Sequence, residues 1–158
     1  MKKRTWKIYA AWILLCEAVG ALSAWLTRSG NRLYAAAVVQ PPLSPPRAVF
    51  PIVWSALYAL MGVGAACVYL TPASERRTRS LLLFFVQLAL NFVWSFLFFQ
   101  LQAFGFSFFW LLALWGFILR MTFSFHRVHP TAALLQIPYL LWVAFAGYLN
   151  GAVWLLNR

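Results

Sequence analysis

Residues 79–120 read RSLLLFFVQLALNFVWSFLFFQLQAFGFSFFWLLALWGFILR, and the only charged positions are the two ends, Arg79 and Arg120. The uncharged run is about twice the length of ~20 residues that a helix needs to cross the hydrocarbon core of a bilayer. Nearly every face of both halves is apolar, so a soluble domain would have no polar surface to present to water. The run therefore predicts an integral membrane protein with two spans, separated near residues 101–105.

Three other stretches are long enough to span a membrane. Ala48–Ser74 and Val128–Asn157 carry no charged residue, and Ile8–Thr27 carries only Glu17. Hydrophobic residues make up 64% of the chain and charged residues 9%, against about 25% charged in soluble domains. The fold class predicted is all-α integral membrane, a five-transmembrane-helix bundle forming one domain over 1–158. We expect a loop at 28–47 and helices near 8–27, 48–70, 80–100, 104–123 and 132–155.

The formal net charge is +11, which in a soluble protein would point to nucleic acid. Here the basic residues lie at the ends of the spans, as the rule for membrane insertion requires, so no nucleic-acid partner is expected. The distribution favours a cytoplasmic N-terminus with the 28–47 loop on the opposite side. Attraction to anionic lipid or to an acidic ligand stays open as an alternative. The residues assigned to the cytoplasmic side are Lys2, Lys3, Arg4, Lys7, Arg76, Arg77, Arg79 and Arg127.

Polar and aromatic residues recur inside the predicted spans. Gln87, Asn91 and Ser95 are spaced by four and share one face of a helix. Tyr139 and Asn150 lie inside the last span. Intramembrane polar groups usually face the interior of a bundle. There they either join helices by hydrogen bonds or orient a flat ligand among aromatic rings. The sequence leaves both interpretations open.

Three motifs follow one another along the chain: PPLSPPRAVFPIVWSALYALMG at 41–62, QLALNFVWS at 87–95 and PYLLWVAFA at 138–146. They resemble, in this order, the tryptophan-rich sensory protein family, also called the translocator protein or peripheral-type benzodiazepine receptor family. The resemblance implies a five-helix bundle, often a homodimer, in a bacterial cell membrane. It also implies a cavity between the helices that accepts a porphyrin, such as protoporphyrin IX or a haem-like ring, or a flat aromatic drug. No cofactor is required.

The resemblance assigns positions to the cavity and to its cover. Tyr139 and Asn150 join the predicted set as polar residues of the last span. The predicted ligand-binding residues are Trp54, Tyr58, Asn91, Trp94, Tyr139, Trp142, Ala146 and Asn150, and the predicted lid residues are Pro45 and Pro46. Five prolines between 41 and 51 fix the backbone φ angle at each site. We therefore expect an irregular, stiff lid, and the alternative is a simple connector.

Some positions depart from the family pattern. Leu43 stands where the family carries a loop Trp that is implicated in porphyrin breakdown, and no catalytic residue is predicted. Gly151 and Leu155 replace the Tyr and the basic residue of a sterol-recognition pattern, so sterol binding is not expected. His126 and His129 are expected in a loop, at a spacing that does not form a helical metal pair, and no metal site is predicted.

The sequence therefore predicts a membrane porphyrin-binding sensor or regulator. One alternative is an enzyme of photo-oxidative porphyrin degradation. Another is a small tetrapyrrole or metabolite transporter, for which Glu17 is the clue, because a carboxylate inside a span needs a proton, an Arg partner or water.

Overall fold

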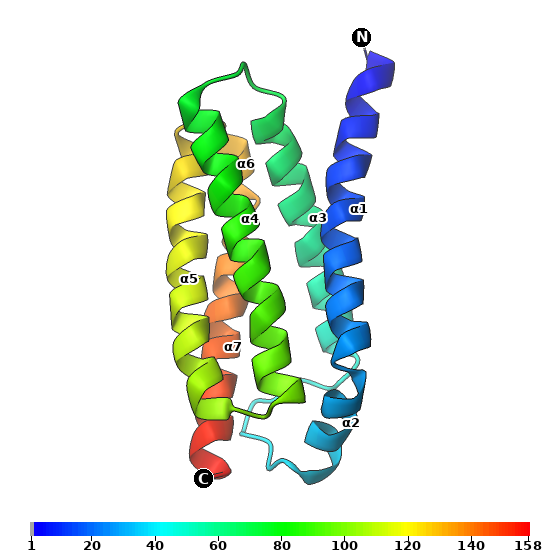
Figure 1. Ribbon diagram of the computed structural model, residues 1–158, viewed down its shortest axis with the longest axis vertical. Coiled ribbons are helices and arrows are strands. Elements are labelled where there is room, and N and C mark those ends of the chain that lie inside the picture. The colour runs from blue at the N-terminus through cyan, green and yellow to red at the C-terminus, as the bar shows by residue number, and fades with distance from the viewer. Residues whose placement is uncertain (1) are drawn as a thin grey trace.

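The computed structural model describes residues 2–158, and over that range the chain is helical apart from short connections (Figure 1). Five segments of the described chain are long and apolar enough to cross a bilayer, which confirms the predicted fold class. The two termini lie at opposite ends of the bundle, as an odd number of spans requires. The long helices are α1 (Lys2–Leu26), α3 (Val49–Tyr69), α4 (Glu75–Ser95), α5 (Phe104–His126) and α7 (Ile137–Leu156). The side chains of Lys2, Lys3 and Arg4, on which the predicted orientation partly depends, lie outside the described residues.

Three shorter elements complete the chain: α2 (Arg28–Ala37), the π-helical segment η1 (Phe96–Gln100) and α6 (Pro130–Leu134). η1 continues α4 without a break, and the chain then turns at Leu101–Ala103, where Gln102 has a φ of 50°. The chain therefore turns in the region where the sequence predicts the division of the long apolar run, near 101–105. A π-helix widens the last turns of a helix and is frequent at functional sites, and here it directs Phe98 and Phe99 toward the lid end of the bundle.

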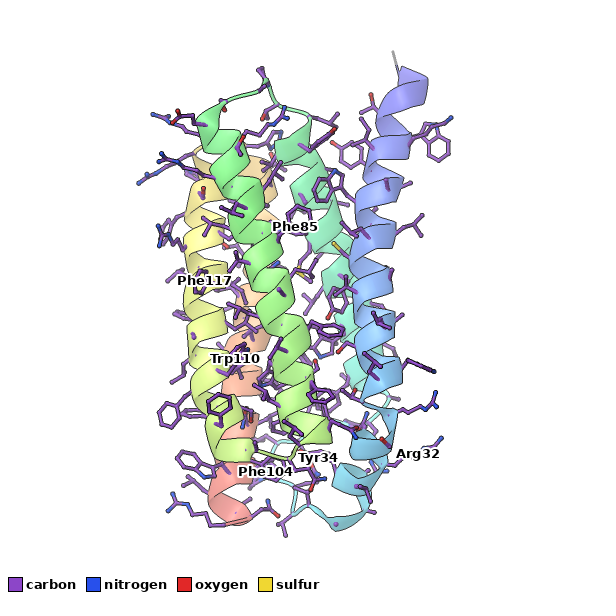
Figure 2. The ribbon with its side chains drawn as sticks, in the orientation of Figure 1. Arg32, Tyr34, Phe85, Phe104, Trp110 and Phe117 are labelled. Atoms are coloured by element: carbon purple, nitrogen blue, oxygen red, sulfur yellow. The ribbon has the colours of Figure 1, made fainter. Side chains whose placement is uncertain are left out.

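The expectation of a single loop over 28–47 was wrong for its first half, which forms α2. Gly30 is buried against the chain of η1, and a Cβ at this position would collide with the carbonyl oxygen of Phe99. Tyr34, one turn later, places its ring centroid 5.2 Å from that of Phe98. Arg32 points away from the bundle (Figure 2). Gly30 and Tyr34 thus form the inner face of a short amphipathic helix, and only residues 38–48 are irregular.

Away from α2 and the proline-rich loop, the helices of the bundle pack closely against one another. α1 packs mainly along α3, and α5 lies between α4 and α7. A Cβ at Gly62 of α3 would lie 2.6 Å from the Cα of Ile13, so only glycine lets α1 and α3 approach to backbone contact. Large apolar side chains such as Leu14, Leu82 and Leu141 are exposed on the outside, where lipid chains are the solvent.

Candidate ligand-binding cavity

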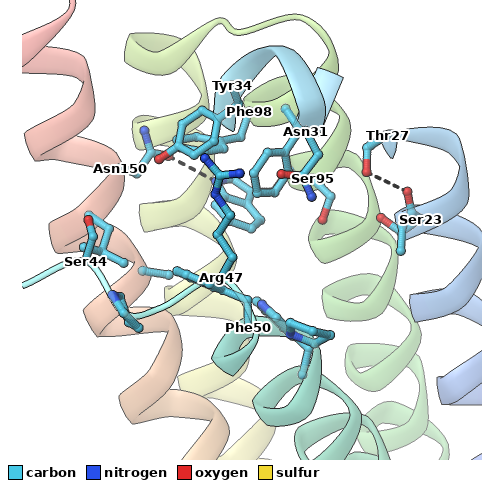
Figure 3. A pocket seen from close by; sticks show the side chains of 18 of the residues that line it. Ser23, Thr27, Asn31, Tyr34, Ser44, Arg47, Phe50, Ser95, Phe98 and Asn150 are labelled. Carbon is cyan, nitrogen blue, oxygen red and sulfur yellow. Dashed lines mark hydrogen bonds between the residues drawn. The ribbon is translucent and has the colours of Figure 1, made fainter. Parts of the chain in front are cut away.

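A cavity of about 640 Å³ opens at the end of the bundle that carries α2 and the proline-rich loop (Figure 3). Its walls come from α1, α3, α4 with η1, and α7, while α2 and residues 40–47 cover it. Ligand pockets in proteins are usually ~300–1,000 Å³, so the cavity has room for a ligand of substantial size.

Aromatic side chains form a large part of the walls. Trp54 on α3 lies 5.7 Å from Tyr58 and 6.5 Å from Trp94, measured between ring centroids. On the opposite side, Trp142 of α7 packs edge-on against Phe50 at 5.9 Å. Aromatic rings offer flat apolar faces at low cost in side-chain entropy. The cavity is therefore suited to a flat aromatic molecule.

Most of the predicted site residues come together around this cavity. Two do not line it: Asn91 and Tyr139 are fully enclosed behind Tyr58. Leu43, at the position of the family's loop Trp, is 79% exposed, has a φ of 68° and does not line the cavity. The predicted residues that do line it are Trp54, Tyr58, Trp94, Trp142, Ala146, Asn150, Pro45 and Pro46.

A chain of hydrogen bonds forms the floor beneath Tyr58. The Tyr58 hydroxyl donates to Asn91 Oδ1 at 3.3 Å, and Asn91 Nδ2 donates to the hydroxyl of Tyr139 at 2.7 Å. Tyr139 in turn donates to Gln87 Oε1 at 2.8 Å, and Gln87 Nε2 approaches Met61 Sδ at 3.8 Å. The chain joins α3, α4 and α7, so Asn91 and Tyr139 hold the helices in register and support a cavity wall from behind.

Asn150 fixes one of the tryptophans. Its Oδ1 accepts a hydrogen bond from Trp94 Nε1 at 3.1 Å and another from Ser107 Oγ at 3.2 Å. Its Nδ2 donates to the carbonyl oxygen of Phe104 at 2.8 Å. With both ends of the amide engaged, Asn150 orients the Trp94 ring and also contributes to the cavity surface. Helix joining and pocket formation therefore coincide at this residue.

Sequence reasoning missed the contribution of α1. Gly20, Ser23 and Ala24 line the cavity, together with Thr27 directly after the helix, and their spacing of three and four residues places them on one face. That small-residue stripe was a usable signal. Gly20 is needed because a Cβ there would collide with the ring of Tyr58. Further lining residues outside the prediction include Tyr34, Arg47, Phe50, Phe98, Phe99 and Phe145.

Side-chain hydrogen bonds fasten the cover. Gln100 Oε1 accepts from Ser29 Oγ at 3.1 Å and from the backbone N–H of Gly30 at 3.2 Å. Near the C-terminus, Asn157 accepts from the N–H of Val39 at 2.9 Å and donates to its carbonyl oxygen at 3.1 Å. These bonds lie at exposed or half-buried positions, so the cover is attached at its edges by bonds for which water competes.

The ionisable residues are sparse. Arg47 is the charged residue that lines the cavity among those the structure describes. Burial raises the pKa of Tyr34, and the hydrogen bond to Gln40 offsets part of that rise, so Tyr34 remains a neutral donor. Glu17 is half-buried on α1, and it forms no ion pair with any Arg whose side chain the structure describes. Within the described chain the ion pair formed is Arg79–Glu75, at 3.7 Å.

Of the two histidines expected in a loop, His129 lies in the short connection between α5 and α6, whereas His126 belongs to α5. His126 ends α5, and His129 caps α6 by accepting a hydrogen bond from the N–H of Ala132 to Nδ1 at 3.3 Å. The cap uses His129 as an acceptor for a free N–H of the first helical turn. Across residues 2–158 no three His, Cys, Asp or Glu side chains gather into a group able to hold a metal ion.

Comparison with known proteins agrees with this architecture. The sequence profile of the TspO/MBR family matches residues 12–155. Over 144 residues the chain is 38% identical to the tryptophan-rich protein TspO of Chlorobaculum tepidum, covering 90% of this chain and 91% of that protein. It is 36% identical over 155 residues to the translocator protein of Bos taurus (97% and 92% covered) and 32% identical over 151 residues to protein CrtK of Rhodobacter capsulatus (95% and 92% covered). The chain is therefore a multi-pass membrane protein of the TspO/MBR family.

Proposed function

We propose that this protein is a membrane receptor that binds a planar tetrapyrrole in the cavity and acts as a sensor or regulator. The observation that carries the proposal is the aromatic-walled cavity of about 640 Å³ beneath the cover of α2 and the proline-rich loop. A ring of conjugated pyrroles presents two large apolar faces, which stack on indole and phenyl rings.

The position of Ala146 supports this assignment. Ala146 lies one turn from Trp142 on the cavity side of α7 and is 9% exposed. Its small side chain leaves open the space that a larger residue would fill. The rings of Trp54 and Trp94 border the same space from α3 and α4, so a flat molecule has aromatic contacts from several sides.

The cover provides a route to signalling. Tyr34 of α2 lines the cavity and packs on Phe98 and Phe99 of η1. A ligand that displaces these rings would shift α2 relative to η1, and the bonds made by Gln100 and Asn157 would change. Regulation then follows from the difference in ligand affinity between two positions of the cover.

Photo-oxidative porphyrin breakdown is a second candidate, because Trp54, Trp94 and Trp142 bring three indole rings to the cavity. Oxidisable indoles close to a photosensitising ring are the feature that this chemistry needs. The loop position held by Leu43 does not supply one.

We also propose that the N-terminus is cytoplasmic in a bacterial cell membrane, and that the chain is a homodimer in the bilayer.

Titration of the purified protein with protoporphyrin IX tests the proposal. Tryptophan fluorescence is followed in the dark, and the Soret absorption band of the bound porphyrin is then followed under light. We expect saturable quenching, weakened in Trp142→Phe, with a stable Soret band. Protein-dependent loss of the Soret band under light would favour the enzyme instead. Quenching that never saturates would contradict tetrapyrrole binding and give priority to the transporter.

A further inference from the structure

The cavity combines apolar walls with a single cationic side chain at its rim. Arg47 is exposed and lies in the loop directly before α3. Figure 3 shows its side chain directed toward the wall that carries Tyr34 and Phe98. The other described lining residues are uncharged. A positive charge at the rim lies where an anionic group of a ligand held among the apolar walls would reach it, and charge-assisted hydrogen bonds are the stronger ones.

The protein itself supplies little to balance this charge. The guanidinium of Arg47 donates one hydrogen bond, from Nη2 to the carbonyl oxygen of Ala35 at 2.6 Å. The whole chain has two acidic residues. Glu75 pairs with Arg79, and Glu17 does not line the cavity. A guanidinium has five N–H donors, so most of the donors of Arg47 remain available to a ligand.

Uncharged polar groups lie at the same rim. Asn31 of α2 and Ser44 of the loop line the cavity, and their side chains form no hydrogen bond to any other residue from 2 to 158. Figure 3 shows Asn31 and Ser44 on either side of Arg47. Together they offer amide and hydroxyl donors around the cation, which suits an acceptor with more than one oxygen.

We propose that Arg47 is the specificity determinant of the cavity and selects planar aromatic ligands that carry a carboxylate on one edge. The apolar part of the ligand lies among Trp54, Trp94 and Trp142, and the carboxylate lies at the rim against the guanidinium. Arg binds carboxylates through two parallel N–H···O bonds, a geometry that Lys does not reproduce. This inference rests on the proposed tetrapyrrole binding and narrows it to the acidic members of that class.

The test compares two porphyrins that share one ring. Protoporphyrin IX carries two carboxylates, and its dimethyl ester carries none. Both are titrated against the full chain in neutral detergent, with wild type, Arg47→Gln, Arg47→Lys and Arg32→Gln measured side by side. Arg32→Gln is the matched control, because Arg32 is an exposed arginine of the cover that does not line the cavity.

We expect wild type to bind the diacid about tenfold more tightly than the ester, and Arg47→Gln to remove that preference by weakening diacid binding alone. Arg47→Lys should fall between the two, and Arg32→Gln should match wild type. If Arg47→Gln weakened both porphyrins equally, Arg47 would act only by holding Ala35, and the inference would be wrong. Equal wild-type affinity for both porphyrins would overturn the inference while leaving the proposed function intact. Failure of wild type to bind either porphyrin would overturn both.

Discussion

The two ends of the bundle are built differently. At the end near α6, small residues bring helices together, as where Gly62 of α3 meets the backbone of Ile13 on α1. At the lid end, tryptophan and phenylalanine rings surround about 640 Å³ of open space. Small residues allow backbones to close on one another, whereas large rings with hydrogen-bonded edges keep them apart. The comparison shows how one bundle combines a closely packed half with a half that encloses a cavity.

The stability of the protein should be more sensitive to added side-chain volume at the closely packed end near α6 than at the lid end. Gly62→Val places a branched side chain against the backbone of Ile13, which cannot move aside without separating α1 from α3. We expect a loss of about 3 kcal/mol in the free energy of unfolding, seen as a lower melting temperature in detergent. Gly116→Val is the control, because a Cβ at Gly116 has no neighbour within 4 Å. Equal melting of the two variants would contradict the packing account.

The chain of hydrogen bonds beneath Tyr58 lies between the two halves, and its disruption is a second test of the comparison. Tyr139→Phe removes a hydroxyl that accepts from Asn91 and donates to Gln87. Both amides are buried and would each lose a partner, so we expect a loss of about 1 kcal/mol in the free energy of unfolding. Tyr148→Phe, which removes an exposed bond to the carbonyl oxygen of Pro42, should have a smaller effect. A scanning calorimetry series in detergent compares the two.

The sequence predicts the membrane spans of both halves more readily than it predicts the structure of the cover. The five spans follow from apolar runs that only a membrane explains, and the turn near 101–105 follows from the length of one such run. The helix at 28–37 is short and has a glycine in it, so its main sequence signal is that Gly30 and Tyr34 lie four residues apart on one face. The π-helical turns of η1 have no comparable signal in the sequence, because no glycine or proline marks Phe96–Gln100 within the apolar run.

The residues of the candidate site also differ in how far the sequence predicts their positions. Trp54, Trp94 and Trp142 were predicted from motifs and do line the cavity, while Asn91 and Tyr139 lie one layer behind it. That distinction requires the three-dimensional structure, since a polar residue on an inward helix face reaches either the cavity or a neighbouring helix. The proposed role of Arg47 at the cavity rim also depends on tertiary structure, because its side chain lies near α2 only when the loop folds back.

Loosening the cover should alter ligand exchange more than stability. Asn157→Ala removes two hydrogen bonds to the backbone of Val39 and leaves the cavity walls untouched. We expect porphyrin dissociation to become about fivefold faster, corresponding to one modest hydrogen bond, with little change in melting temperature. Stopped-flow displacement measures the rate. Unchanged dissociation in this variant would mean that the cover at Val39 does not gate the cavity.

Glu17→Gln should have the smallest effect. Glu17 lies on α1 outside the cavity lining and forms no ion pair within the described chain. We expect protoporphyrin affinity within about twofold of wild type, since no direct contact with the ligand is lost. A transporter driven by protons would instead need this carboxylate, and proteoliposomes with a pH gradient would show uptake by wild type that stops in the variant.

The most direct measurement of the central claim compares two substitutions on one helix. Ala146→Leu fills the cavity from α7, and Ala144→Leu adds the same volume at an exposed position two residues away. In a protoporphyrin titration followed by tryptophan quenching, we expect Ala146→Leu to lose saturable binding and Ala144→Leu to keep the wild-type curve. Retained binding in Ala146→Leu, with both variants folded, would show that the ligand site lies elsewhere.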